Sequence, residues 1–150
     1  MGKRRKRPIQ LMYQKYGEHS EGVVCAGCCN CLFTKNGGKK IFKCLAYGVT
    51  ADPSTDWHPN RTACGYFNMP HDEVRDVPLL GIRGIRPQMR REIMIALNRK
   101  ITWAGYKLGS CADQDKEYFE KVISTSKAKL AEFEALEEAE KNEKEKKNEQ

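Results

Sequence analysis

The sequence CAGCCNC at residues 25–31 contains four of the seven cysteines of the chain. Its first half is a C-x2-C unit, in which a tight backbone turn lets two thiolates face one metal ion. Two further cysteines follow singly, in FKCLAYG at residues 42–48 and in TACGYF at residues 62–67. Four thiolates in a tetrahedral arrangement are what a structural zinc site requires. We therefore predict zinc ligands at Cys25, Cys28, Cys44 and Cys64, with Cys29 and Cys31 as alternates.

Other ligands and another metal group fit the same cysteines. An iron–sulfur cluster is also held by four thiolates, so a redox or sensor protein is an alternative. The histidines His19, His58 and His71 are possible replacements for one cysteine. Zinc is favoured because it is the commoner stabilising metal in small basic domains. Six cysteines between residues 25 and 64 are difficult to explain as ordinary core residues, whereas Cys111 is expected to be an ordinary thiol.

The predicted fold class is α+β, a small metal-stapled module of short strands and turns followed by two helices. Residues 21–72 are rich in Gly, Asn, Asp and Pro, which favours short strands. Asn36-Gly37-Gly38 predicts a hairpin turn. We expect four segments: a basic arm at 1–20, the metal-binding module at 21–72, a bridge and basic helix at 73–110, and a charged C-terminal helix with a disordered end at 111–150.

Two helices are predicted in the second half of the chain. The first begins at Pro87 and ends near Ala104, with Gly105 as the stop. Ile95 falls on the side of this helix that is otherwise polar. The second begins near Ala112, where Ser110 and Asp113 fit a capping box. Its apolar positions are Phe119, Val122, Ile123, Leu130, Phe133 and Leu136, and after Ala139 only polar and charged residues remain, which predicts a frayed or disordered end.

Charge is distributed unevenly along the chain. Residues 1–112 contain 19 Lys and Arg against 8 Asp and Glu, a net charge of +11, whereas residues 113–150 contain 8 against 12, a net charge of −4. A basic body favours nucleic acid, a nucleoprotein complex or an anionic surface as partner. The expected nucleic-acid-binding residues are Lys3, Arg4, Arg5, Lys6, Arg7, Arg83, Arg86, Arg90, Arg91, Arg99 and Lys100.

Four short units of the sequence occur in an order seen elsewhere. They are CAGCCN, KCLAYG, STDW and ACGYFN, all within residues 25–68. The set resembles small cysteine-rich proteins of Firmicute phages and mobile elements, in which C-x2-C-C-N, K-C-x2-Y-G, T-D-W and A-C-G-x-F/Y-N units recur in this order. The resemblance implies a bacterial or phage origin and a metal-binding module, but no activity. It also marks Tyr47, Asp56 and Trp57, for which we expect structural roles around the metal.

Phage and mobile-element proteins of this size suggest a second function. The chain would then be a protein-binding inhibitor of a host machine, such as an RNA-guided nuclease (an anti-CRISPR protein) or RNA polymerase. No enzyme is expected, because the sequence has no H-E-x-x-H, deaminase or P-loop motif. With no long apolar run and no secretory signal, we expect no membrane span and a cytoplasmic location in a bacterial host. The sequence leaves the oligomeric state open.

Overall fold

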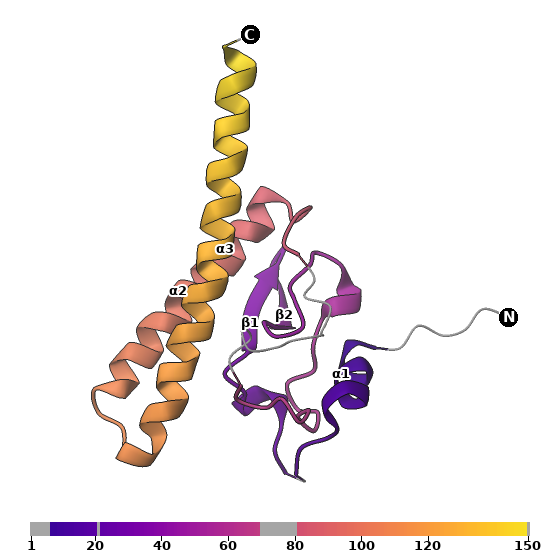
Figure 1. Ribbon diagram of the computed structural model, residues 1–150, viewed down its shortest axis with the longest axis vertical. Helices are drawn as coiled ribbons and strands as arrows, with labels where there is room; N and C mark the ends of the chain where they lie inside the picture. The colour runs from indigo at the N-terminus through magenta and orange to yellow at the C-terminus, as the bar shows by residue number, and fades with distance from the viewer. Residues whose placement is uncertain (1–6, 21, 70–80, 150) are drawn as a thin grey trace, which may run out of the picture.

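The protein was analysed as a computed structural model that describes residues 7–20, 22–69 and 81–149. A helix, α1, comes first, and a two-stranded sheet and two long helices, α2 and α3, follow (Figure 1). This confirms the α+β class in its coarse form, a hairpin followed by two helices. The elements are α1 (Pro8–Tyr16), η1 (Cys25–Gly27), β1 (Cys31–Asn36), β2 (Lys39–Cys44), η2 (Pro53–Thr55), α2 (Pro87–Leu108), η4 (Asp113–Asp115) and α3 (Lys116–Asn148).

The predicted hairpin turn is present between β1 and β2. The strands are antiparallel, and Asn36 pairs with Lys39 at the closed end. Gly37 and Gly38 have φ values of 59° and 85°. A two-residue turn with positive φ at both positions matches the twist of the strands, and glycine adopts this conformation without steric cost.

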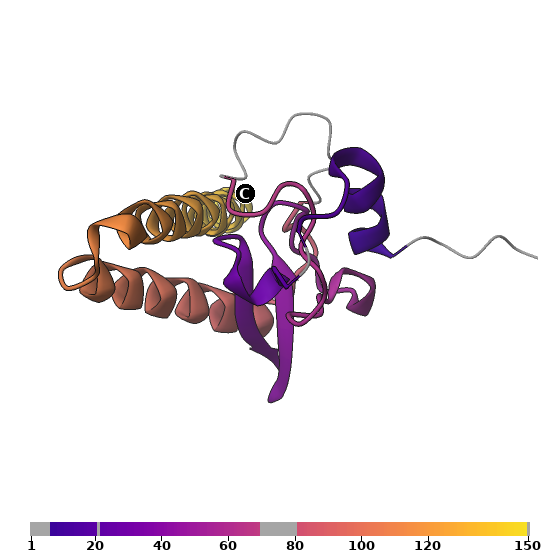
Figure 2. The same cartoon turned by 90° about the horizontal axis from the view of Figure 1, so that it is seen from below.

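The helices α2 and α3 form an antiparallel pair on one side of the hairpin (Figures 1 and 2). The predicted end of the first helix at Gly105 is wrong, because α2 continues to Leu108. Glycine inside a helix costs only about 1 kcal/mol relative to alanine. Tertiary packing offsets that cost, since Ala104 is fully buried in a cluster with Cys29 and Val122.

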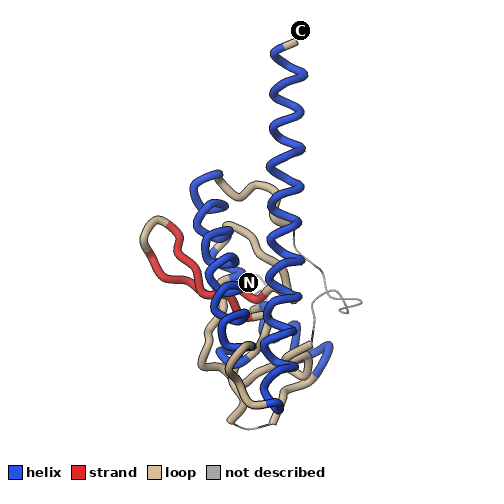
Figure 3. The backbone as a smooth tube through the Cα atoms, turned by 90° about the vertical axis from the view of Figure 1, so that its left-hand side faces the viewer, coloured by secondary structure: helices blue, strands red, loops and turns tan. Residues whose placement is uncertain are grey.

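The start and end of α3 also differ from expectation. Ser110 forms no capping box, because the 3-10 turn η4 begins only at Asp113 and shows no side-chain cap at Ala112. The α-helix begins at Lys116 and continues to Asn148. The tail after Ala139 is therefore helical up to Asn148. With 33 residues α3 is roughly 50 Å long, and it extends well beyond α2 (Figure 3).

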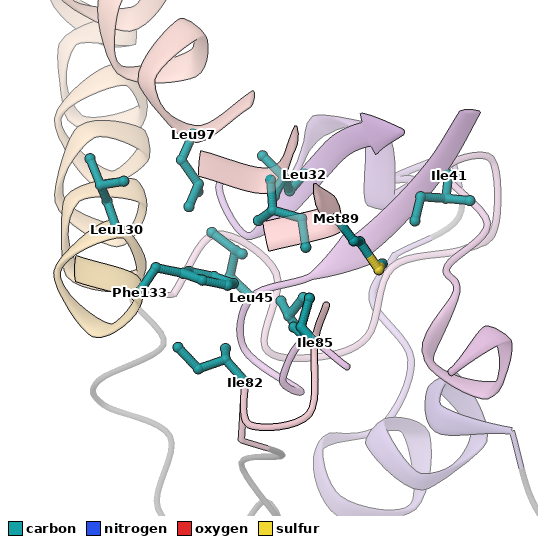
Figure 4. Close-up of a cluster of buried hydrophobic side chains, with 11 residues drawn as sticks. Leu32, Ile41, Leu45, Ile82, Ile85, Met89, Leu97, Leu130 and Phe133 are labelled. Carbon is teal, nitrogen blue, oxygen red and sulfur yellow. The ribbon is translucent and has the colours of Figure 1, made fainter. Parts of the chain in front are cut away.

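One hydrophobic core joins the hairpin to both long helices. Leu32 of β1 and Leu45 after β2 lie in the same cluster as Leu97 of α2 and Phe133 of α3 (Figure 4). Leu45 and Phe133 are completely buried. The cysteine-rich segment and the helical pair therefore share one interior.

The segment predicted as a basic arm contains the helix α1. Pro8 occupies its first turn, which suits the fixed φ of proline. Ile9 and Met12 are buried in a cluster with Tyr47 and Trp57. The basic residues Lys3, Arg4, Arg5 and Lys6 lie outside the described residues. Among the helices that the structure describes, none is long and apolar enough to cross a membrane.

Candidate metal centre and basic surface

Five cysteines line one small cavity, which we call the thiol cavity. Its volume is about 20 Å³. All four predicted ligands reach it, together with one of the two alternates. The lining residues are Cys25, Cys28, Cys31, Cys44, Cys64, Trp57, Ala63 and Phe67.

Short local structures bring the cysteines of the first two segments together. The turn η1 holds Cys25 and Cys28 close, with a backbone hydrogen bond of 2.9 Å from Cys28 N to Cys25 O. The hairpin register places Cys31 opposite Cys44. Leu45 N donates to Asn30 O over 2.8 Å, which ties the end of the hairpin to the CAGCCNC segment.

A close backbone approach fixes Cys64. It forms an isolated β-bridge with Glu18, just after α1. A Cβ atom added to Gly65 would lie 2.0 Å from the carbonyl oxygen of Tyr16. Only glycine, which has no Cβ, therefore leaves room for Tyr16 at this position.

Backbone N–H groups act on three of the five thiols. Cys28 Sγ accepts from Asn30 N over 3.5 Å, and also from Asn68 N over 3.4 Å. The backbone amides of Ala46 and Tyr47 act to lower the pKa of Cys44, and that of Tyr66 acts to lower the pKa of Cys64. Donors directed at sulfur favour the thiolate over the thiol.

At Cys25 the N–H donor is an indole group and not a backbone amide. Trp57 Nε1 donates to Cys25 Sγ over 3.3 Å. The Trp57 ring packs against Tyr47, with ring centroids 5.7 Å apart. Asp56 forms an ion pair of 2.7 Å with the fully buried Lys43. These contacts fit the structural roles that the sequence suggested.

Burial opposes ionisation at most of these thiols. Desolvation raises the pKa of Cys44 well above its usual range and the pKa of Cys64 to about 11. The pKa of Cys25 is also raised, mainly by desolvation. Cys28 is the exception, because a hydrogen bond with the Cys29 thiol, assisted by the two backbone amides, lowers its pKa to about 6.

The two alternate ligands lie in different environments. Cys31 lines the thiol cavity. Cys29 does not, and packs with Ala104 and Val122 of the long helices. Its sulfur lies 3.8 Å from Met69 O.

The remaining candidates lie elsewhere. His19 stacks beside Phe67, His58 is exposed, and neither lines the thiol cavity. His71 lies outside the described residues. Cys111 donates to Leu108 O at the end of α2, far along the chain from the other cysteines.

The thiols share a cavity without forming a complete ligand set. Within the described ranges, no group of three or more His, Cys, Asp or Glu side chains is arranged so that it could hold a metal ion as it stands. The metal-stapled form of the predicted fold is thus not part of the observed architecture, and it is taken up below as a proposal.

The predicted basic residues separate into two groups. Arg7, Arg83, Arg86, Arg91 and Arg99 are exposed. Arg90 is buried, and its guanidinium makes two hydrogen bonds to the Glu140 carboxylate, of 2.8 and 3.1 Å, and one to Ile85 O. Lys100 Nζ donates to the carbonyl oxygens of Cys29 and Cys31. The prediction that Arg90 and Lys100 belong to an open basic surface is therefore wrong, because both have internal partners.

A groove between β1 and α2 was not predicted from the sequence. Its volume is about 660 Å³. Phe33 and Trp103 contribute exposed rings, and Ile95 contributes an exposed aliphatic side chain. One sign of it was present in the sequence, namely Ile95 on the otherwise polar side of the helix.

Comparisons with protein-family models, curated proteins and solved structures found no match to this chain.

Proposed function

We propose that the chain is a small zinc-binding accessory protein of phage or mobile-element type that binds nucleic acid or a nucleoprotein. The observation that carries the metal part is the convergence of cysteines from three separate segments on one cavity. The backbone N–H groups that act on Cys28, Cys44 and Cys64 add to this support. Donors of this kind stabilise charged sulfur, which is the form that binds metal.

The size of the thiol cavity favours a single ion over an iron–sulfur cluster. Its volume of about 20 Å³ is close to the roughly 10–15 Å³ that one water molecule requires. A cluster of several iron and sulfur atoms would need a much larger space. A single zinc ion needs only four thiolates at about 2.3 Å around one point.

The hydrogen-bond pattern favours Cys25, Cys28, Cys44 and Cys64 as the ligands. Each of these sulfurs has an N–H donor from the backbone or from Trp57. Cys31 lines the cavity, but among the described residues no N–H donor acts on its sulfur. In this proposal Cys31 is a neutral neighbour of the metal.

Exposed arginines support the nucleic-acid part. Arg83, Arg86, Arg91 and Arg99 lie along one stretch that ends in α2, and all are exposed. Glu92 is the sole acidic residue of α2. Arginine side chains of this kind bind phosphates without reading sequence.

The test has two parts. First, protein purified without added metal is analysed for its elemental content and its absorbance spectrum. About one zinc per chain without visible absorption supports the proposal. Iron with sulfide would instead support the redox or sensor alternative. Binding to labelled oligonucleotides is then measured between 50 and 200 mM salt, and neutralisation of several phosphates predicts an affinity that falls at least tenfold. An affinity that does not change with salt would refute the nucleic-acid part.

The second candidate, a protein-binding inhibitor, is favoured by the projecting end of α3. Residues 141–149 are exposed, and this part of the helix has no neighbouring element in the views of Figures 1 and 3. A chain truncated after Glu140 keeps the ion pair between Arg90 and Glu140. If this truncation abolished capture of a host nuclease or polymerase while oligonucleotide binding persisted, the inhibitor function would be supported.

A further inference from the structure

We infer that the groove between β1 and α2 binds unpaired bases of single-stranded nucleic acid by stacking them on Trp103 and Phe33. The inference rests on the proposed function and specifies which form of nucleic acid the chain recognises. The groove is lined by residues of β1, of the hairpin turn and of α2. Its volume of about 660 Å³ lies within the range of about 300–1,000 Å³ that is usual for small-molecule sites.

Both rings are partly exposed, and each packs against a second aromatic ring. Trp103 is 44% exposed and makes a T-shaped contact with Phe119 of α3, with centroids 5.4 Å apart. Phe33 is 45% exposed and packs against Phe42 across the hairpin, with centroids 5.2 Å apart. Rings held in this way are already ordered, so binding a base costs little side-chain entropy.

The exposed apolar residues of the described chain are concentrated here. Of the large hydrophobic side chains that are exposed, Phe33, Ile95 and Trp103 line the groove. Tyr106, at 79% exposure, lies three positions after Trp103, on a neighbouring part of the same helix surface. An apolar surface of this kind, next to polar residues, marks a binding site more often than a chance exposure.

Cations beside the rings complement a phosphate backbone. Lys35 and Arg99 line the groove and are exposed, and neither forms an ion pair with another described residue. Glu92 is the only acidic residue of the lining. Lys100 also lines it, although its ammonium group is held by the carbonyl oxygens of Cys29 and Cys31.

A groove lined by exposed aromatic rings and cations favours single-stranded over double-stranded nucleic acid as its ligand. In a duplex the faces of the bases are covered by their neighbours, so a protein ring has no free face to stack on. Unpaired bases present that face whatever their identity, and positively charged grooves with aromatic side chains bind them with little sequence preference. A partner peptide would gain less from the flat rings and from Lys35 and Arg99, unless it were itself acidic.

Fluorescence of Trp103 gives a direct test. The chain contains two tryptophans, and Trp57 is only 7% exposed. Titration with a 12-nucleotide single strand of mixed sequence is expected to quench the emission, and Trp103→Phe is expected to remove that quenching. Trp103→Ala is expected to weaken single-strand binding roughly 5- to 150-fold, the effect of losing one stacked base. The 12-base-pair duplex and a strand of abasic sites should bind more weakly than the intact strand.

Two controls separate the groove from general electrostatics and from folding. Arg83 is exposed outside the groove lining, so Arg83→Ala should weaken the binding of intact and abasic strands by equal factors. Trp103→Ala is informative only if it keeps the helical content measured by circular dichroism. If that content falls, Phe33→Leu tests stacking instead, because it keeps an apolar side chain but removes the flat ring.

The outcomes are distinct. Equal affinity for intact and abasic strands, with no effect of Trp103→Ala or Phe33→Leu, would overturn the groove assignment and leave the proposed function standing. No binding of any nucleic acid at 50 mM salt would overturn both. Quenching by an acidic peptide such as oligoglutamate, without quenching by the single strand, would assign the groove to a protein partner.

Discussion

Replacing Cys44 by serine should abolish the stabilisation of the protein by zinc. Cys44 is buried and lines the thiol cavity, where two backbone amides act to lower its pKa. A structural zinc site contributes roughly 10–16 kcal/mol, or about 2.5–4 kcal/mol for each of four ligands. Since about 1.4 kcal/mol corresponds to a factor of ten, loss of one ligand weakens zinc binding roughly 100-fold.

The stability that follows from this affinity can be measured directly. At a free zinc concentration of 100 times Kd, binding stabilises the native chain by about 2.7 kcal/mol. At the same zinc concentration a 100-fold weaker variant gains only about 0.4 kcal/mol. For a chain of this size the wild-type gain corresponds to an increase in Tm of roughly 5–10 °C. The quantity compared is the increase on adding zinc, so any cost of the substitution to the metal-free protein cancels.

The assay is thermal unfolding in a zinc buffer, followed by circular dichroism. Cys111→Ser is the matched control, since Cys111 lies at the end of α2 with Leu108 as its partner. Cys31→Ser tests the choice of ligands, because Cys31 lines the cavity and is predicted not to bind. The reasoning is refuted if Cys44→Ser retains the full increase in Tm, or if Cys111→Ser loses it.

Three further predictions concern the frame around the two sites. Phe133→Ala should lower the free energy of unfolding by about 3–5 kcal/mol in urea titrations, because the Phe133 ring is completely buried where α3 meets the hairpin; a change below about 1 kcal/mol would contradict this packing. The Arg90 hydrogen bonds lower the pKa of the Glu140 carboxyl, so its contribution to stability is full above the usual carboxyl range and is lost as pH falls below it; Glu140→Gln should therefore lower stability at pH 7 and have little effect at pH 2, and equal effects at both pH values would refute the pairing. Gly65→Ala should destabilise the fold and weaken zinc binding, because the added Cβ would collide with the Tyr16 carbonyl; normal zinc content and an unchanged Tm would show that the backbone is not held as described.

Local chemistry made part of the fold predictable. The turn at Asn36-Gly37-Gly38 depends on the φ preference of glycine, which is present in the sequence itself. The C-x2-C turn at Cys25 and Cys28 is likewise local, so it could be inferred without knowing the tertiary structure. Cys44 and Cys64 reach the cavity through the hairpin register and the bridge to Glu18, and the sequence indicated them only through the chemistry of thiols.

The features that sequence reasoning missed depend on distant partners. Arg90 resembles any arginine on a basic helix until Glu140, fifty positions later, is placed beside it. Lys100 is directed inward by carbonyl oxygens some seventy positions earlier in the chain. The helix α1 has a weak amphipathic pattern, and its burial depends on Tyr47 and Trp57. No local pattern encodes these contacts.

The thiol cavity and the groove meet at the beginning of β1. Cys31 lines both, with its side chain among the thiols and next to Leu32 and Phe33 in the groove wall. Lys100 of α2 spans the same point, because it binds the carbonyl oxygens of Cys29 and Cys31 while its stem lines the groove. Under the two proposals made above, the zinc site and the strand site share Cys31 and Lys100, so zinc is expected to change the affinity for the strand. Because coupling free energies are reciprocal, a bound strand is then expected to change the affinity for zinc by the same factor, which titrations of the strand with and without zinc would measure.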